Sequence, residues 1–234
     1  PKPGIYLEDP IAVLDYASLY PSSIIEKNIS HETLIEDTSL LPLIGEDNYE
    51  KIEYQNWCYI NTGKGDTIEK KLGDGMTTCY FLKKEFMKEN NLIENLKEDE
   101  NPMGIIPSVL RDLLDARNST KKRMKTEPDE FKKKVLDGLQ LAYKVTANSV
   151  YGAIGATTNP ICMKDIAAST TAVGRSLLHL AQEKTLEKFD GAEIVYGDTD
   201  SIFINFNPKD DKGNKLTGKE GLKKSIDLGC QAEE

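Results

Sequence analysis

The stretch "EIVYGDTDSIFINF", residues 193–206, places two aspartates, Asp198 and Asp200, at a tight bend between two apolar segments. Both segments are rich in β-branched and aromatic residues, so we predict two strands joined in a hairpin. Two carboxylates this close raise each other's pKa unless a cation lies between them. Mg²⁺ prefers oxygen ligands, so the bend predicts a metal site. A simple hairpin turn is the alternative, and by itself the commoner use of such residues.

A third carboxylate, Asp15, ends the apolar run "IAVLD" at residues 11–15. This run has the length and the β-branched content of a buried strand. If the strand lies beside the hairpin in one sheet, Asp15 joins the other two aspartates. Three acids around two divalent ions is the arrangement expected for in-line phosphoryl transfer.

Helical periodicity dominates the middle of the chain. Apolar residues recur at helical spacing from Ile106 and again from Phe131, with the breaker "TEPDE" at 126–130 between them. This pattern predicts a helical hairpin, and a third helix is predicted from about Asp165 to Phe189. Residues from about 30 to 100 are polar and contain the turn signals "GKGD" and "GDG", which predict an irregular segment.

Two polar faces follow from the predicted hairpin. Lys144, Asn148 and Tyr151 are spaced i, i+4 and i+7, and Arg117 and Lys121 are spaced i and i+4 on the preceding helix. Antiparallel packing would combine the cations of the two faces in a clamp suited to a triphosphate. A solvated basic surface is the alternative, and we favour it for the neighbouring lysines Lys122, Lys125, Lys132, Lys133 and Lys134.

Composition limits the class of protein. The chain has 234 residues, of which 38% are hydrophobic, enough for one large domain or two small ones. The formal net charge of −9 argues against a polyanionic partner unless basic residues are segregated, as they are between Arg111 and Lys134. The four cysteines form no C-x-x-C pair, which predicts neither a zinc site nor a disulfide framework. No apolar run is long enough to cross a bilayer, so we expect a soluble intracellular protein and no membrane partner.

Three segments, taken in order, resemble the polymerase motifs A, B and C of family B, or alpha-like, DNA-dependent DNA polymerases. They are "DYASLYPSSII" at 15–25, "KVTANSVYG" at 144–152 and "YGDTDS" at 196–201. In addition, "IPSVLRDLLDARNSTKKRMK" at 106–125 resembles the first fingers helix of that family, and "STTAVGR" at 169–175 resembles the helix that leads to motif C.

The resemblance implies an α+β fold, with a palm of antiparallel sheet backed by helices and an inserted helical-hairpin fingers subdomain. The expected divisions are palm at 1–30, a variable connection at 31–104, fingers at 105–150 and palm again at 151–234. No exonuclease motif precedes these segments and no thumb follows them, so we expect part of a longer polymerase.

The resemblance also implies roles for individual residues. The catalytic, metal-binding group comprises Asp15, Asp198 and Asp200, with the backbone carbonyl of Tyr16 as a further metal ligand. The residues that contact the incoming nucleotide would be Ser18, Leu19, Tyr20, Arg117, Lys121, Lys144 and Asn148. Those beside the nascent base pair and the DNA would be Tyr151, Gly152 and Thr199.

The activity implied is template-directed addition of deoxynucleotides to a primer 3′-hydroxyl in DNA replication. Two Mg²⁺ ions, for which Mn²⁺ can substitute, would serve as cofactors, and primer–template DNA and deoxynucleoside triphosphates would be the partners. The residues define no processivity factor, although the family allows one. A nuclear or viral replication site is expected, and the compact connection favours a large DNA virus.

Two other functions stay open at this point. One is a different metal-dependent nucleotidyl-transfer enzyme, such as a nucleotidyl cyclase or a sugar-nucleotide transferase, which also uses paired aspartates with a metal. The other is a DNA-binding fragment, inactive without its thumb, whose cations hold duplex without chemistry. Template-dependent incorporation of the matched nucleotide would distinguish a DNA polymerase from the first alternative. DNA binding that does not depend on Mg²⁺ would favour the second.

Overall fold

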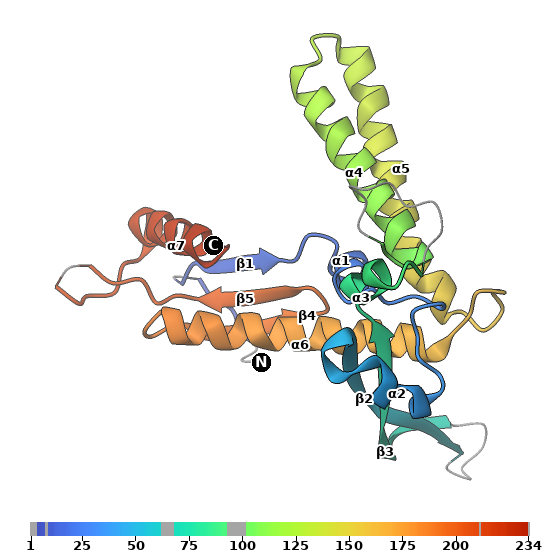
Figure 1. The fold of residues 1–234 in the computed structure, drawn as a ribbon. Coiled ribbons are helices and arrows are strands. Elements are labelled where there is room, and N and C mark those ends of the chain that lie inside the picture. Colours follow the sequence, from blue (N-terminus) through green and yellow to red (C-terminus); the bar gives the residue numbers. More distant parts are fainter. Residues whose placement is uncertain (1–3, 8, 62–67, 93–101, 211, 234) are drawn as a thin grey trace. The chain divides into compact units, whose positions relative to one another are not determined.

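The computed structural model describes all residues except 1–3, 8, 62–67, 93–101, 211 and 234. The chain divides into two compact units (Figure 1). The first unit comprises Pro1–Leu19 and Gly174–Glu234, and the second comprises Tyr20–Val173. Antiparallel sheets and helices occur together in the described residues, which confirms the predicted α+β class.

The sheet of the first unit has three antiparallel strands in the order β1-β5-β4. The strands are β1 (Ile11–Asp15), β4 (Glu193–Asp198) and β5 (Ser201–Asn205). The strands β4 and β5 form the predicted hairpin, and the predicted strand at residues 11–15 lies beside β5. Figure 1 shows β5 between its two partners.

One face of this sheet is covered by two helices, α6 (Lys164–Lys188) and α7 (Gly218–Glu233). Alternate residues of the central strand, Ile202 and Ile204, point to this side and form the core with Phe206. The partly buried side chains packed against this core include Ala12 and Leu14 from β1, Leu178 and Ala181 from α6, and Leu228 and Ala232 from α7. The helices and alternate strand residues thus fix which side of the sheet is buried.

The opposite face of the sheet, which we call the open face, is exposed within this unit. Val13 has an exposed fraction of 52% and Tyr196 one of 46%. The ring of Tyr196 packs edge-on against Phe203, with 5.3 Å between ring centroids. Apolar side chains on this face therefore gain only part of their burial from the described residues of the unit.

A β-bulge in β4 decides which residues reach the open face. Ile194 pairs with Ile204 and Tyr196 with Phe203, so Val195 is an extra residue in the strand. A regular strand alternates its side chains strictly, and one inserted residue reverses the alternation beyond it. The bulge thus places Gly197 opposite Ile202, on the core side, and Asp198 opposite Ser201, on the open face.

The second unit contains the predicted helical hairpin, formed by α4 (Ile105–Thr126) and α5 (Glu130–Gly155). Glu127 precedes Pro128 and is extended, with φ of −75° and ψ of 119°, because proline disfavours a helical residue before it. The carboxylate of Asp129 then caps α5 by accepting hydrogen bonds from the amides of Phe131 and Lys132. The breaker sequence therefore ends one helix and starts the next.

The prediction of an irregular segment between residues 30 and 100 is wrong for much of its length. Two long antiparallel strands, β2 (Tyr49–Asn61) and β3 (Ile68–Leu82), form a separate sheet. The "GDG" signal lies inside β3, opposite an irregularity in β2, where a Cβ on Gly73 would lie 3.1 Å from the Asn56 carbonyl oxygen. "GKGD" lies outside the described residues.

Short helices and a buried core complete the second unit. The helices are α1 (Leu19–Glu26), α2 (Leu41–Ile44), α3 (Lys84–Glu89) and the 3₁₀ turns η1 (Thr38–Leu40) and η2 (Glu46–Asn48). Its fully buried side chains include Ile24, Ile29, Phe81, Leu110, Ile154 and Ile166. Within the described ranges, no helix has the length and hydropathy needed to cross a membrane.

Candidate active site

Two of the predicted acidic residues share one row across the sheet of the first unit. Asp15 pairs with Ser201 in β5, and Ser201 pairs on its other side with Asp198. Residues directly opposite in an antiparallel pair point to the same face, so both aspartates belong to the open face, and both are exposed. Two strand spacings, about 9.6 Å, separate their backbones.

Asp200 lies closer to the end of β1. The backbone amide of Tyr16 donates a hydrogen bond of 2.8 Å to the Asp200 carbonyl, which joins the residue after Asp15 to the hairpin turn. The turn itself is Thr199-Asp200, and Thr199 has a φ of 43°, in the left-handed region. Of the two aspartates of the bend, Asp200 is therefore the one whose backbone is hydrogen-bonded to the residue that follows Asp15.

The turn is also held by side-chain hydrogen bonds. The Thr199 hydroxyl donates to the Asp198 carboxylate over 3.1 Å, and the Ser201 hydroxyl donates to the Asp198 carbonyl over 3.3 Å. These contacts restrain the bend without using the carboxylates of Asp15 or Asp200. Oxygen donors on three adjacent strand ends are the type that a hard divalent cation prefers.

The described side chains do not form a preassembled metal cage. Among the described residues, no group of three or more His, Cys, Asp or Glu side chains is close enough to hold an ion. Backbone pairing brings the aspartate residues into neighbouring positions. Their carboxylate groups repel one another, which disfavours close approach of the side chains when no cation is bound. The residues fit a divalent cation in donor type and in backbone placement.

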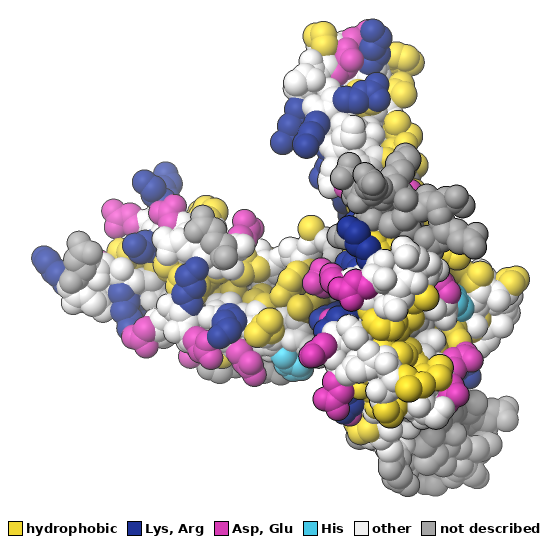
Figure 2. Space-filling model, in the orientation of Figure 1, with side chains coloured by type: hydrophobic (Ala, Val, Ile, Leu, Met, Phe, Trp, Pro, Cys, Tyr) yellow, Lys and Arg dark blue, Asp and Glu magenta, His cyan; other side chains and the backbone are white. Residues whose placement is uncertain are grey.

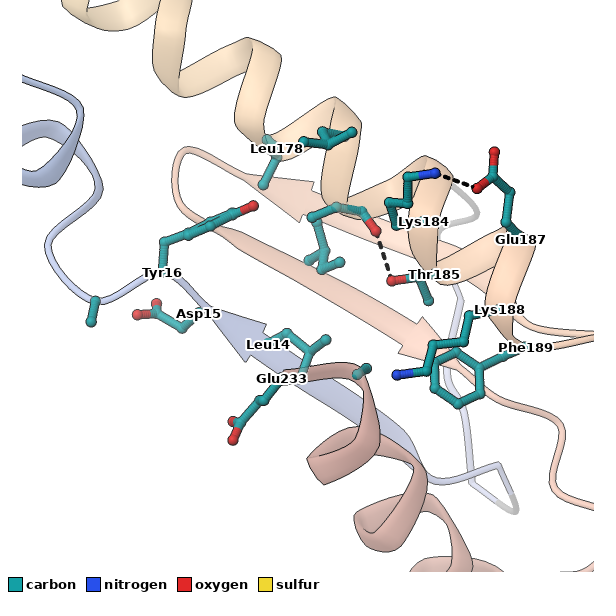
Figure 3. A pocket seen from close by; sticks show the side chains of 15 residues that line it. Leu14, Asp15, Tyr16, Leu178, Lys184, Thr185, Glu187, Lys188, Phe189 and Glu233 are labelled. Carbon is teal, nitrogen blue, oxygen red and sulfur yellow. Dashed lines mark hydrogen bonds and ion pairs between the residues drawn. The ribbon is translucent and has the colours of Figure 1, made fainter. Parts of the chain in front are cut away.

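Tyr16 links the end of β1 to α6. Its hydroxyl donates a hydrogen bond of 3.0 Å to the Leu177 carbonyl, and burial raises the pKa of this phenol. Figure 3 shows the ring reaching from the strand toward the helix, while the Asp15 carboxylate lies beside it at the strand end. The side chain of Tyr16 thus has a packing role, and only its backbone remains for the predicted ligand role.

A pocket of about 890 Å³ lies on the helix-covered side of the first unit. Figure 3 shows its lining from β1, α6 and α7, including Leu14, Phe189 and Glu233. Asp15 and Tyr16 border it, but the row formed by Asp15, Ser201 and Asp198 belongs to the opposite face of the sheet. We therefore do not assign the nucleotide to this pocket.

The predicted nucleotide residues after Asp15 lie in a turn and a helix. Ser18 has a φ of 58°, which turns the chain sharply from β1 into α1. Leu19, at the start of α1, is buried, with an exposed fraction of 4%. Its packing role is clear, so a contact with nucleotide would have to use its backbone.

In the second unit, Tyr20 contacts Tyr151. The two ring centroids are 4.5 Å apart and the ring planes are tilted by 35°. Both side chains are half-buried. Gly152 follows on α5, and a Cβ built there meets no described atom within 4 Å, so the helix surface beside Tyr151 is open.

The predicted cations lie along the hairpin as an ordered series. The Arg117 Nε donates to the Gln140 Oε1 over 3.4 Å, so these two residues lie opposite each other in the α4–α5 pair. In this antiparallel register Lys144 is one turn from Gln140, about 6 Å along the axis, and Lys121 is displaced by a turn in the opposite direction. Lys121, Lys144 and Asn148 are exposed, whereas Arg117 is half-buried. Figure 2 shows basic side chains along this hairpin.

Comparisons with known proteins agree with these features. The family model described as DNA polymerase family B matches residues 1–227. The chain belongs to DNA polymerase family B. This confirms the resemblance seen in the three motifs, and membership of the family implies a divalent metal cofactor.

The similar proteins include viral and eukaryotic polymerases. A DNA polymerase of Pyramimonas orientalis virus is 39% identical over all of this chain and 21% of the viral protein. A DNA polymerase of Phaeocystis pouchetii virus is 40% identical over all of this chain and 24% of its own length. The DNA polymerase delta catalytic subunit of Drosophila melanogaster is 32% identical over all of this chain and 18% of the subunit.

A solved structure supports the fold of this family B chain. The family B DNA polymerase from the archaeon Pyrobaculum calidifontis matches with a TM-score of 0.56 and 28% identity, over 88% of this chain and 21% of that one. The chain thus spans only about a fifth to a quarter of these viral and archaeal polymerases.

Proposed function

We propose that this chain carries the catalytic centre of a DNA-directed DNA polymerase that adds deoxynucleotides to a primer 3′-hydroxyl under the direction of a template. The observation that carries the proposal is the hydrogen bond from the Tyr16 amide to the Asp200 carbonyl. It joins the ends of motifs A and C beside Asp15, in a chain whose family membership is shown.

Asp15 and Asp200 are the principal proposed ligands of divalent ions, for which Mg²⁺ is the favoured identity and Mn²⁺ a substitute. The side chain of Asp198 and the carbonyl of Tyr16 complete the proposed donor set. Ions held by these residues would lower the pKa of the attacking hydroxyl and neutralise charge on the departing pyrophosphate. The open face beside the carboxylates, with Tyr196 and Val13 exposed, is proposed to face the primer end, and Thr199 to contact the DNA.

The proposed nucleotide-binding residues of the second unit divide into two groups. Arg117, Lys121 and Lys144 bind the phosphates, because guanidinium and ammonium groups donate charge-assisted hydrogen bonds to phosphate oxygens. Asn148, Tyr151 and Gly152 border the nascent base pair, and the open surface at Gly152 supports this placement. Outside these two groups, Ser18 and Leu19 of the first unit and the adjoining Tyr20 follow the triphosphate and sugar. The ring of Tyr20 packs against the ring of Tyr151.

Primer–template DNA and deoxynucleoside triphosphates are the proposed partners, and the similarity to viral and delta-type polymerases favours a nuclear or viral replication site. The test is primer extension by the full-length polymerase with Mg²⁺, comparing Asp15→Asn with the unaltered enzyme. We expect extension by the matched nucleotide to fall by at least about a thousandfold, with DNA binding retained. Unchanged extension would reject the carboxylate assignment, and a cyclic or sugar-transfer product would favour another nucleotidyl-transfer enzyme.

A further inference from the structure

A loop that follows α1 forms a polar junction, which we define as Asn28, Ser30, His31, Glu32 and Thr33. Asn28 ends the helix in the left-handed conformation, with φ of 51°. The Ile29 amide then donates back to the Ile24 carbonyl over 3.0 Å, and both of these side chains are fully buried. This is the hydrogen-bond and hydrophobic pattern of a Schellman helix end, so the direction of the loop is fixed locally.

The side chain of Asn28 uses both ends of its amide inside the protein. Its Nδ2 donates to the Leu82 carbonyl at the end of β3 over 2.8 Å and lies 3.2 Å from the Met87 sulfur in α3. Its Oδ1 accepts from the Gly104 amide over 2.8 Å. With an exposed fraction of 1%, this amide would leave several polar groups unpaired if it were removed.

Ser30 and Glu32 cap the first helix of the hairpin from a distant part of the sequence. The Ile105 amide donates to the Glu32 carboxylate, and the Ile106 amide donates to the Ser30 hydroxyl over 3.3 Å. The Ser30 hydroxyl in turn lies 2.9 Å from the Glu32 carboxylate oxygens. The N-cap residue of α4 is Gly104, which has no side chain, so the junction supplies the acceptors that the helix start lacks. The negative charge of the Glu32 carboxylate also interacts favourably with the positive, N-terminal end of the α4 dipole.

The same loop contacts the other end of the hairpin. The His31 Nε2 lies 3.0 Å from the Ile161 carbonyl oxygen, in the turn that follows α5. Space at the root of α4 is tight as well, because a Cβ on Gly104 would lie 2.6 Å from the Ser30 Cβ and 2.8 Å from the Glu32 Oε1. One short loop is thus bonded to the start of α4 and to the segment after α5.

We infer that this polar junction sets the direction of the α4–α5 hairpin and thereby positions Arg117 and Lys144 for nucleotide, with Asn28 and Glu32 as positioning residues. The inference rests on the proposed function for the phosphate contacts. Arg117 lies twelve residues beyond Ile105, or about 18 Å along α4. A tilt of roughly 5° at the root would therefore shift Arg117 by about 1.5 Å. Misplacement by about 1 Å can reduce a rate a hundredfold.

The test uses three variants at the junction in the full-length polymerase. Glu32→Ala removes the acceptor for the Ile105 amide, Glu32→Gln keeps an acceptor oxygen, and Gly104→Ala introduces the clash. Gly104 has φ of −56° and ψ of 161°, which alanine adopts without strain, so the Cβ contacts alone would cause any effect. Glu36→Ala is the matched control, because Glu36 is exposed and the described part of the structure records no polar contact for it.

We expect Glu32→Ala and Gly104→Ala to raise the KM for deoxynucleotide by about fivefold or more, with the Kd for primer–template within about twofold. Glu32→Gln and Glu36→Ala should stay within about twofold of the unaltered enzyme in both quantities. Hydrogen exchange of the Ile105 and Ile106 amides should become faster in Glu32→Ala, which reports loss of the cap without any catalytic assay.

The outcomes separate this inference from the proposed function by including Lys144→Ala. If that variant impairs nucleotide use while Glu32→Ala and Gly104→Ala lower only the thermal midpoint, the junction is merely structural and the inference is overturned. If Lys144→Ala also leaves nucleotide use unchanged, the phosphate contacts of the proposed function fail, and the inference fails with them. A normal KM in Glu32→Gln, where Glu32→Ala raises it, would support the positioning role of the junction. The Ile105 and Ile106 amides should then remain protected from exchange in Glu32→Gln.

Discussion

The ring of Tyr20 packs against the ring of Tyr151, with 4.5 Å between their centroids and a tilt of 35°. The first tyrosine belongs to motif A and the second to motif B, more than a hundred residues later. Aromatic pairs at this separation are attractive beyond their burial, so each ring restrains the other. A restrained ring can exclude a substrate group that a mobile ring would accommodate.

We predict that Tyr20→Ala in the full-length polymerase raises ribonucleotide use relative to deoxyribonucleotide use by well over tenfold. Removing a steric clash selectively rescues the disfavoured substrate, whereas a cavity in the core lowers activity toward both sugars. Incorporation of ATP and dATP opposite template T measures the ratio. Tyr49→Ala is the control, because Tyr49 also packs against a tyrosine, Tyr80, in the same unit. An unchanged sugar ratio in Tyr20→Ala would make this ring a packing residue only.

Asp200→Asn should abolish primer extension, by at least about a thousandfold, while leaving the fold intact. The fold is expected to survive because the Tyr16 amide bonds to the backbone carbonyl of Asp200, which the substitution retains. Extension assays across a Mg²⁺ titration, with circular dichroism as the check on folding, measure both effects. Asp227→Asn is the control, because it removes the same charge from the exposed surface of α7, and we expect it to leave primer extension unchanged. Near-normal extension by Asp200→Asn would contradict the two-ion proposal.

Lys144→Ala should weaken the use of deoxynucleotide much more than the binding of primer–template. An ammonium that contacts phosphate contributes to the nucleotide complex, while a cation that holds duplex contributes to the DNA complex. Steady-state KM and a DNA-binding isotherm at fixed salt distinguish the two. Lys134→Ala, an exposed lysine on the same helix, is the control. Equal losses for DNA and nucleotide would assign Lys144 to a duplex-binding surface.

Gly197 should tolerate alanine but not valine. A Cβ at this position would lie 3.2 Å from the Gln182 Nε2 and 4.0 Å from the Leu178 Cδ2, both on α6. The end of the glutamine side chain can move for one methyl group, but branched atoms would press on the helix itself. We expect Gly197→Ala to change the free energy of unfolding little and Gly197→Val to lower it by about 1–3 kcal/mol. Denaturant unfolding of both variants measures this difference, and equal stability would show that the strand can move away from α6.

Local sequence signals predicted those elements whose hydrophobic periodicity is clear and whose ends carry turn or breaker residues. The hairpin around Asp198, the strand that ends at Asp15 and the two helices separated by Pro128 all follow from periodicity and turn residues. The strands β2 and β3 did not follow, because their sequences are rich in polar residues and Gly73 and Gly75 lie inside one of them, a pattern that locally indicates a loop. Their pairing is a tertiary preference that local propensity does not record.

The candidate site could be predicted only in part, because its arrangement also depends on tertiary contacts. The identities of Asp15, Asp198 and Asp200 are visible in the sequence, but the cross-strand partner Ser201 and the side to which each residue belongs depend on register. The contact of Tyr20 with Tyr151 and the cap provided by Glu32 join segments far apart in the chain, and no spacing rule connects them. Pairwise contacts of this kind become visible only in three dimensions.

The extra residue Val195 makes the number of residues in β4 as important as their identity. Deleting it would remove the bulge and leave a regular strand in which Ile194 still pairs with Ile204 and Asp198 still pairs with Ser201 on the open face. Adding one residue between Tyr196 and Asp198 would instead turn the aspartate toward the side of Ile202 and Ile204, although no side chain of the motif had been altered. A single-codon insertion there is thus expected to be as harmful as loss of the acid itself. For anyone grafting this hairpin onto another scaffold, the segment to transplant begins at Ile194 rather than at the visible motif.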